Sequence, residues 1–313
     1  MAITLSDMRS FLSRAYSSVN QNKINGIHAE VDFFNYLNGL GFAGRTSPGG
    51  WIMRPSRVPN FGAEAIAVFP EIVQVGGDYS PGRQPPQVPP SVEAAAYKLR
   101  DAHIKTYFCY PVEYPDGRIA WMGMRRGIPD PPPPSDIVDQ MASMFIPRRG
   151  KYNFLKYHAN VSGISDEAIQ DQYSLAALRI YANNAYMMET SDVDRLLWGA
   201  NTIYPVEVKE KTRVTNDVNI GEWFGLDVGP FTKLAFFAAW YGQLKSLFIV
   251  REIADTETRQ LVQWWAIEFA DVAKHASWVF QSGGANMLGG RSAVVRIPLH
   301  AFTPLDGAFL NAL

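Results

Sequence analysis

The second half of the chain alternates between short apolar runs and a helical segment, and this order strongly restricts its fold. The apolar runs 193–198 and 202–212 are separated only by residues 199–201, Gly-Ala-Asn. Strands joined by such a short turn pair as an antiparallel hairpin. A helical pattern follows at 231–243, and a buried apolar strand follows at 247–253. This alternation predicts an α/β fold with a central mixed sheet that is flanked by helices.

The first half of the chain is less regular and is interrupted by proline. Apolar residues recur at helical spacing in several segments, and two apolar runs flank the turn sequence Tyr-Pro-Asp-Gly at 114–117. The proline-rich segments 80–91 and 129–134 indicate extended surface chain. The expected elements are helices at 6–20, 24–38 and 165–187, and a hairpin with strands at 104–112 and 118–124.

Composition and charge exclude several classes of protein. Hydrophobic residues make up 47% and charged residues 19% of the sequence, which is typical of a folded globular protein rather than a disordered one. A formal net charge of -1 argues against a polybasic protein with a cationic surface throughout. Because Cys109 is the one cysteine, a disulfide framework and a cysteine-rich zinc module are excluded. The most apolar window, 231–250, contains two lysines, so we expect no membrane span, and the first residues lack the apolar stretch of a signal peptide.

Charged residues alternate with apolar ones along the strand expected at 202–212. Because side chains alternate between the two faces of a strand, the apolar and the charged side chains separate. One face carries Tyr204, Val206 and Val208, and the other carries Glu207, Lys209 and Lys211.

The strand before this one begins with two aspartates, Asp192 and Asp194. Antiparallel pairing across the short turn brings Asp194 close to Glu207, and Asp192 remains an alternative because the register is open. Two carboxylates beside a lysine suit a divalent metal, since Mg²⁺ binds through one or two carboxylates and keeps several waters. Such a site acts on phosphate groups, where Lys209 can position water and offset negative charge.

A further acidic residue lies in the helix expected at 24–38. Ile27, Glu30, Phe34 and Leu37 recur at helical spacing, which places Glu30 on the stripe that faces the core. A carboxylate there is unfavourable unless it is paired or lies near a metal. The alternative is that Glu30 lies at the edge of this stripe and reaches solvent.

These motifs resemble the PD-(D/E)XK nuclease superfamily, which includes type II restriction endonucleases, Holliday-junction resolvases and repair nucleases. The resemblance rests on Asp194, the strand turn and Glu207-Val208-Lys209, on Gly26-Ile27-His28-Ala29-Glu30 in the early helix, and on the following strand–helix–strand order. It implies that Asp194 and Glu207 bind the metal, that the Val208 carbonyl joins them, and that Lys209 assists the attacking water. It also implies a supporting or second-metal role for Glu30.

The resemblance also implies how the chain is divided. Residues 1–42 would supply helices of the nuclease core, 43–165 an inserted substrate-recognition region, and 166–313 the main part of the core. Arginine can bind phosphates or read guanine edges, and lysine mostly grips the DNA backbone. The alternative for each basic group is a solvated charged surface. The expected DNA-binding residues are Arg125, Arg126, Arg148, Arg149, Lys151, Lys211 and Arg213.

The sequence therefore predicts a restriction-endonuclease-like fold and a Mg²⁺-dependent type II restriction endonuclease that hydrolyses double-stranded DNA. A palindromic duplex site favours a two-fold arrangement, so we expect a homodimer, with no membrane partner. We expect a cytoplasmic, prokaryotic protein. Two alternatives stay open: a structure-specific or repair nuclease of the same superfamily, and a non-catalytic DNA-binding protein on the same scaffold.

Overall fold

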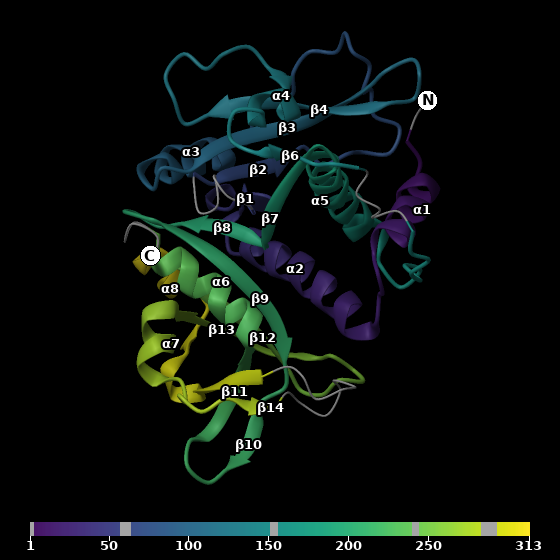
Figure 1. Cartoon of the computed structure of the whole chain (residues 1–313). Coiled ribbons are helices and arrows are strands. Elements are labelled where there is room, and N and C mark those ends of the chain that lie inside the picture. Colours follow the sequence, from purple (N-terminus) through teal and green to yellow (C-terminus); the bar gives the residue numbers. More distant parts are fainter. Residues whose placement is uncertain (1–2, 57–63, 151–155, 240–243, 283–292) are drawn as a thin grey trace. The chain divides into compact units, whose positions relative to one another are not determined.

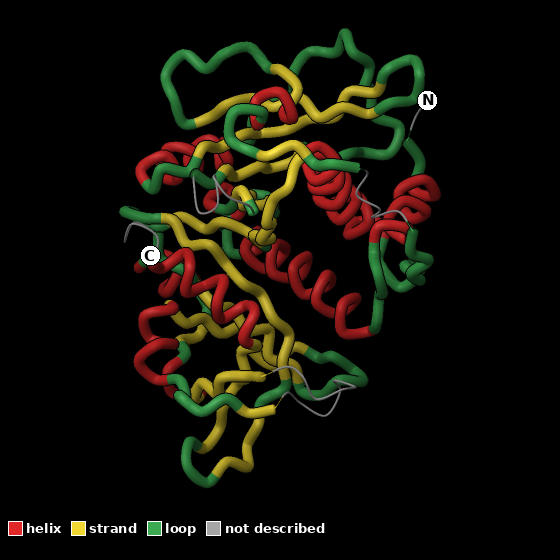
Figure 2. The backbone as a smooth tube through the Cα atoms, in the orientation of Figure 1, coloured by secondary structure: helices red, strands yellow, loops and turns green. Residues whose placement is uncertain are grey.

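The computed structural model describes residues 3–56, 64–150, 156–239, 244–282 and 293–313 (Figures 1 and 2). The chain is mixed α/β and forms two compact units. Unit 1 comprises Met1–His28 and Ser47–Val193, and unit 2 comprises Ala29–Thr46 and Asp194–Leu313. The expected α/β class is confirmed. The compact units divide the chain at positions other than 42 and 165, and the functional division at those two residues stays a prediction.

Unit 1 is built on a seven-stranded sheet in which β2 and β3 are parallel and the other neighbours are antiparallel. In spatial order the strands are β5 (Ser135–Asp136), β4 (Ile119–Arg126), β3 (Lys105–Glu113), β2 (Ile66–Pro70), β1 (Gly50–Pro55), β7 (Tyr186–Val193) and β6 (Ile146–Pro147). Its helices are α1 (Leu5–Ala15), the first part of α2 (Gln21–Gly39), α3 (Pro90–Asp101), α4 (Ile137–Met141) and α5 (Asp166–Ala185).

Several local expectations for unit 1 are confirmed, and three need correction. The helix expected at 6–20 ends at Ala15, and the next helix begins at Gln21. β3 and β4 form the expected hairpin, and Gly117 in its turn has a φ of 78°, a conformation that favours glycine. The Ser165 side chain caps α5, but this helix stops at Ala185 and the chain continues as a strand. The proline-rich segment is not extended throughout, because Pro90 begins α3, where a missing N–H is tolerated.

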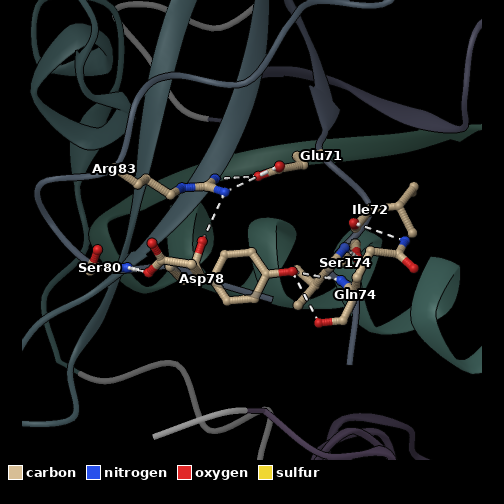
Figure 3. A network of polar contacts seen from close by, with 9 residues as sticks. Glu71, Ile72, Gln74, Asp78, Ser80, Arg83 and Ser174 are labelled. Carbon is tan, nitrogen blue, oxygen red and sulfur yellow. Dashed lines mark hydrogen bonds and ion pairs between the residues drawn. The ribbon is translucent and has the colours of Figure 1, made fainter. Parts of the chain in front are cut away.

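The loop between β2 and α3 is held by polar contacts (Figure 3). Arg83 forms a two-point ion pair with Glu71 and donates a further hydrogen bond of 3.2 Å to the Asp78 carbonyl. The Asp78 side chain accepts a hydrogen bond of 2.9 Å from the Ser80 N–H. Arg83 also lies over the ring of Tyr79, 5.0 Å from its centroid. This segment is therefore ordered by its own side chains as well as by proline.

Unit 2 contains two sheets. In the five-stranded sheet, β9 and β12 are parallel and the other neighbours are antiparallel. Its spatial order is β16 (Thr303–Pro304), β13 (Leu261–Glu268), β12 (Leu247–Ile253), β9 (Ile203–Lys211) and β8 (Arg195–Trp198). The four-stranded sheet has the order β10 (Val214–Asp217), β11 (Gly221–Asp227), β15 (Ala293–Pro298) and β14 (Gln281–Ser282).

Helices cover both faces of the five-stranded sheet. The connection between the parallel strands β9 and β12 contains the expected helix α6, but it also contains β10 and β11, which the sequence did not predict. The helical elements of unit 2 are the second part of α2, η1 (Ala43–Arg45), α6 (Val228–Ala239), α7 (Phe269–His275), η2 (Leu299–Ala301) and α8 (Gly307–Ala312). The last expected residues of α6, 240–243, lie outside the described part of the chain.

Two hydrophobic clusters fill unit 2, one on each face of the sheet, as the alternation of side chains requires. The first cluster packs α2 against the sheet and includes Ala29, Phe33, Leu37, Tyr204, Val206, Val208, Leu247 and Ile249. The second packs α6 and α7 against the other face and includes Leu226, Leu234, Phe248, Val250, Ile267 and Val272. Among the described residues, no helix has both the length and the apolar character needed to cross a bilayer.

Candidate active site

The β8–β9 hairpin forms as the short turn predicts. Arg195 of β8 lies opposite Val206 of β9, and the pairing is antiparallel. The Gly199 N–H donates to the Thr202 carbonyl at 3.0 Å and closes the turn. A Cβ at Gly199 would lie 1.9 Å from the carbonyl oxygen of Leu313, so this tight turn needs glycine.

Asp194 lies in the bend between β7 and β8, and it is the first residue of the second segment of unit 2. The register of the hairpin places it beside Glu207, and its Oδ2 accepts a hydrogen bond of 2.8 Å from the Val208 N–H. The expected proximity of Asp194 and Glu207 is therefore confirmed. Asp192 differs, because it belongs to β7 in unit 1, where it lies opposite Trp51.

Glu207 and Lys209 emerge from the sheet face opposite to Tyr204, Val206 and Val208, as strand alternation predicts. Lys209 Nζ lies 2.5 Å from Glu207 Oε1.

A second lysine reaches the same carboxylates from α6. Lys233 Nζ contacts Glu207 Oε2 and lies 3.9 Å from Asp194 Oδ1. Two carboxylates and two ammonium groups thus meet at one end of the hairpin.

Burial makes the charges of this cluster interdependent. The Glu207 and Asp194 side chains are 2% and 5% exposed, and the Lys233 side chain is 13% exposed. A buried carboxylate is costly unless it is paired, and each lysine supplies part of that pairing. Burial alone would lower the pKa of Lys209, but the charges of Glu207 and Asp194 outweigh it and raise that pKa above its ordinary value. Lys209 therefore remains a cation at neutral pH.

Lys211, two residues further along β9, has a different environment. Burial lowers its pKa below the ordinary value, and Asp227, whose Oδ2 is 3.5 Å from Lys211 Nζ, opposes this only in part. The neighbouring positive charge of Lys209 lowers the pKa of Lys211 further. Arg213 is committed to ion pairs with Glu252 at 2.8 Å and Glu222 at 3.1 Å. The expected DNA-binding role of Lys211 and Arg213 stays a prediction.

The residues around Asp194 and Glu207 fit a Mg²⁺ ion by their chemistry. An ammonium group already lies between the two carboxylates, so the position favours a cation. The Val208 N–H points toward Asp194, and the carbonyl of a strand residue points to the same side as its N–H. Within the described residues, no three or more His, Cys, Asp and Glu side chains form a group that could hold a metal. A Mg²⁺ ion at this position would therefore have two carboxylates and a backbone carbonyl as protein donors and would need waters to complete its shell.

Glu30 does not join these carboxylates in such a group. The buried stripe of α2 is formed by Ala29, Phe33 and Leu37, spaced four residues apart, and Glu30 is half-buried beside it. Of the expected stripe, Ile27 and Leu37 are buried, whereas Glu30 and Phe34 are only partly buried, which agrees with the alternative that Glu30 lies at the edge of the stripe. α2 also covers the sheet face opposite to Glu207, which explains the separation. A supporting role for Glu30 stays a prediction.

The basic residues expected to bind DNA in unit 1 have varied surroundings. Arg125 lies over the Tyr107 ring at 5.2 Å, and burial lowers the pKa of its guanidinium. Arg126 Nε lies 2.5 Å from Glu93 Oε2. Arg125 and Arg126 therefore both contact other residues of unit 1.

The other basic group, Arg148, Arg149 and Lys151, has a described contact at Arg148. Arg148 Nε donates a hydrogen bond of 2.6 Å to the Asn183 carbonyl, while Arg149 is exposed. Lys151 lies outside the described residues. DNA binding by both clusters stays a prediction.

Sequence reasoning missed Lys233. Its signal is a single lysine directly before the buried Leu234, in a helix whose remaining residues from Phe231 to Ala239 carry no charge. Only the packing of α6 on the sheet face that bears Glu207 turns this lysine into a site residue.

Comparison with protein-family models, with curated proteins and with solved structures gives no match to this chain. The geometry of unit 2 is therefore the basis for assigning a function.

Proposed function

We propose that the chain is a Mg²⁺-dependent endodeoxyribonuclease with a PD-(D/E)XK core, and that it acts as a type II restriction endonuclease on double-stranded DNA. The observation that supports this best is the meeting of Asp194 and Glu207 at one end of the β8–β9 hairpin, with Lys209 on the same strand. The parallel pairing of β9 with β12, which follow each other in the five-stranded sheet with β10, β11 and α6 between them in the chain, also supports the proposal.

In this proposal Asp194, Glu207 and the Val208 carbonyl hold the metal. When bound, Mg²⁺ supplies positive charge to the scissile phosphate and lowers the pKa of a bound water. The Lys209 ammonium is held against Glu207 and donates hydrogen bonds to the attacking water and to the phosphate oxygens. As a protonated amine, Lys209 positions the attacking water and offsets the negative charge of the phosphate, and it does not remove a proton from that water.

Sequence-specific cutting of a palindromic duplex requires two equivalent sites, so the proposed active species is a homodimer. Unit 1 would supply the contacts that recognise DNA. Among the expected contact residues that the structure describes, Arg149 is exposed to solvent. We propose that it binds the phosphate backbone of the DNA.

Digestion of linear phage DNA by the purified chain tests this proposal. Discrete fragments in the presence of Mg²⁺, lost with EDTA, are expected for a restriction enzyme. A smear would indicate a structure-specific or repair nuclease, and intact DNA would refute the enzyme proposal in favour of a DNA-binding protein.

The variant Lys209→Ala tests the site itself. Lys209 is 32% exposed, so its loss should leave the fold intact while cutting falls by at least about 100-fold. Lys245→Ala is the matched control, since Lys245 lies on the surface of unit 2 and pairs with Glu268. Full activity in Lys209→Ala, with an unchanged circular dichroism spectrum, would remove Lys209 from the catalytic site.

A further inference from the structure

Lys233 occupies a particular position among the oxygens of Asp194 and Glu207. Each carboxylate has one oxygen engaged elsewhere: Asp194 Oδ2 accepts from the Val208 N–H, and Glu207 Oε1 faces Lys209. The other oxygen of each carboxylate, Oδ1 and Oε2, faces the Lys233 ammonium. One cation from α6 thus bridges the two oxygens that a metal would use.

We propose that Lys233 is an internal cation that competes with Mg²⁺ for Asp194 and Glu207, and that its ammonium is displaced when the metal binds. This inference rests on the proposed function, since it concerns the metal site of the same nuclease. Lys233 is then a positioning residue: it holds the two carboxylates in place before the metal arrives.

Distances and charges exclude simultaneous occupation. Mg²⁺ binds oxygen at about 2.0–2.1 Å and requires near-octahedral geometry, which leaves no room for an ammonium group on the same two oxygens. The divalent ion and the lysine also repel each other at such a separation. Lysine suits an exchangeable role because its ammonium is a compact point charge on a flexible stem. Leu234 is fully buried and anchors α6, so the Lys233 side chain can move without the helix.

Titration of the full chain with Mg²⁺ alone, in the absence of DNA and followed by calorimetry, tests the competition. The variant Lys233→Met keeps the length of the side chain and removes its charge, so its Mg²⁺ dissociation constant should fall by about tenfold or more. Lys245→Met removes a surface charge from the same unit and should bind Mg²⁺ like the wild type. Equal or weaker binding by Lys233→Met than by wild type would overturn the competition and leave the nuclease proposal standing.

A measurement on the wild-type chain guards against misfolding of the variant. Amine labelling with mass spectrometry should modify Lys233 slowly without Mg²⁺, because it is buried and ion-paired, and several-fold faster with saturating Mg²⁺. An unchanged Lys233 labelling rate at saturating Mg²⁺ would overturn the inference. Absence of Mg²⁺ binding in all three proteins would overturn it too, and the DNA digestion then decides separately whether the chain is a nuclease.

Discussion

Replacement of Glu207 by glutamine tests whether the buried charges of unit 2 depend on one another. The glutamine amide keeps the size of the side chain and removes the negative charge that faces both lysines. Glu207 is 2% exposed and Lys233 is 13% exposed, so the lost charge leaves an ammonium group with little access to water. We expect the Glu207→Gln variant to be folded but clearly less stable than the wild type.

The magnitude follows from the geometry. Removing one partner of a fully buried ion pair costs about 3–5 kcal/mol. Lys209 is 32% exposed and can turn toward water, which reduces that cost. Lys233 also keeps Asp194 at 3.9 Å, where unit charges attract by about 4 kcal/mol at an effective dielectric constant of 20, before desolvation is subtracted. The expected loss is therefore about 2–3 kcal/mol, of which Lys233→Met in the same chain should restore about 1 kcal/mol or more.

Hydrogen exchange measured by mass spectrometry on peptides from β9 and β12 is the suitable assay, because a chain of two units need not unfold in one step. The control is Glu268→Gln, which removes a less buried carboxylate paired with Lys245 and should change stability by no more than about 0.5 kcal/mol. The reasoning fails if β9 exchanges as slowly in Glu207→Gln as in the wild type. It fails equally if the double variant is less protected than the single one.

Two further perturbations test the cores of the two units. Burial raises the pKa of the Cys109 thiol above its ordinary value of 9.0, so the folded state holds its proton more tightly than the unfolded state. The thiol should then lower the unfolding free energy by up to about 1.4 kcal/mol per pH unit above pH 9. Cys109→Ala should reduce the slope of alkaline urea titrations by that amount, and buried tyrosines such as Tyr173, whose pKa burial also raises, supply the rest. Phe248 is fully buried against Phe302, and Phe248→Ala should cost about 3–5 kcal/mol in urea unfolding, whereas Val262→Ala at a 50% exposed position should cost under about 0.5 kcal/mol. An alkaline slope in Cys109→Ala equal to that of the wild type, or equal midpoints for the two apolar variants, would contradict these assignments.

Local sequence rules predicted the parts of the fold that depend on neighbouring residues. The bounds of β12, Leu247–Ile253, were predicted correctly because the apolar run 247–250 and the apolar Ile253 indicate a buried strand. The proximity of Asp194 and Glu207 was predictable for a related reason, since a short turn fixes both the partner and the direction of the strand. Register was not predictable from the turn alone, and the structure resolves it by placing Asp192 in another sheet.

Features that depend on tertiary packing were missed. α3 begins at Pro90 within a proline-rich segment, where packing of Val92 and Leu99 overrides the extended preference of the preceding prolines. Lys233 is 26 residues from Glu207 in the sequence, and its contacts depend on the face of the sheet that α6 covers. The stripe of α2 was predicted only in part: Leu37 belongs to the buried cluster, but Ala29 and Phe33 join it in place of Glu30 and Phe34, because neighbouring apolar residues leave the facing side of a helix open by one position.

A second buried carboxylate on β9 helps to separate structural from functional ion pairs. Glu210 is 6% exposed and is bound by Arg251 at 2.8 Å and by Arg259 at 2.7 Å. The planar guanidinium groups of the two arginines make directional hydrogen bonds to this carboxylate, which suits a structural ion pair. Glu207 and Asp194 instead share lysines, whose point charges exchange more readily with another cation. The same strand therefore carries one carboxylate held by two arginines and another held by two lysines, and the proposed exchange of a lysine for a metal ion requires the second arrangement.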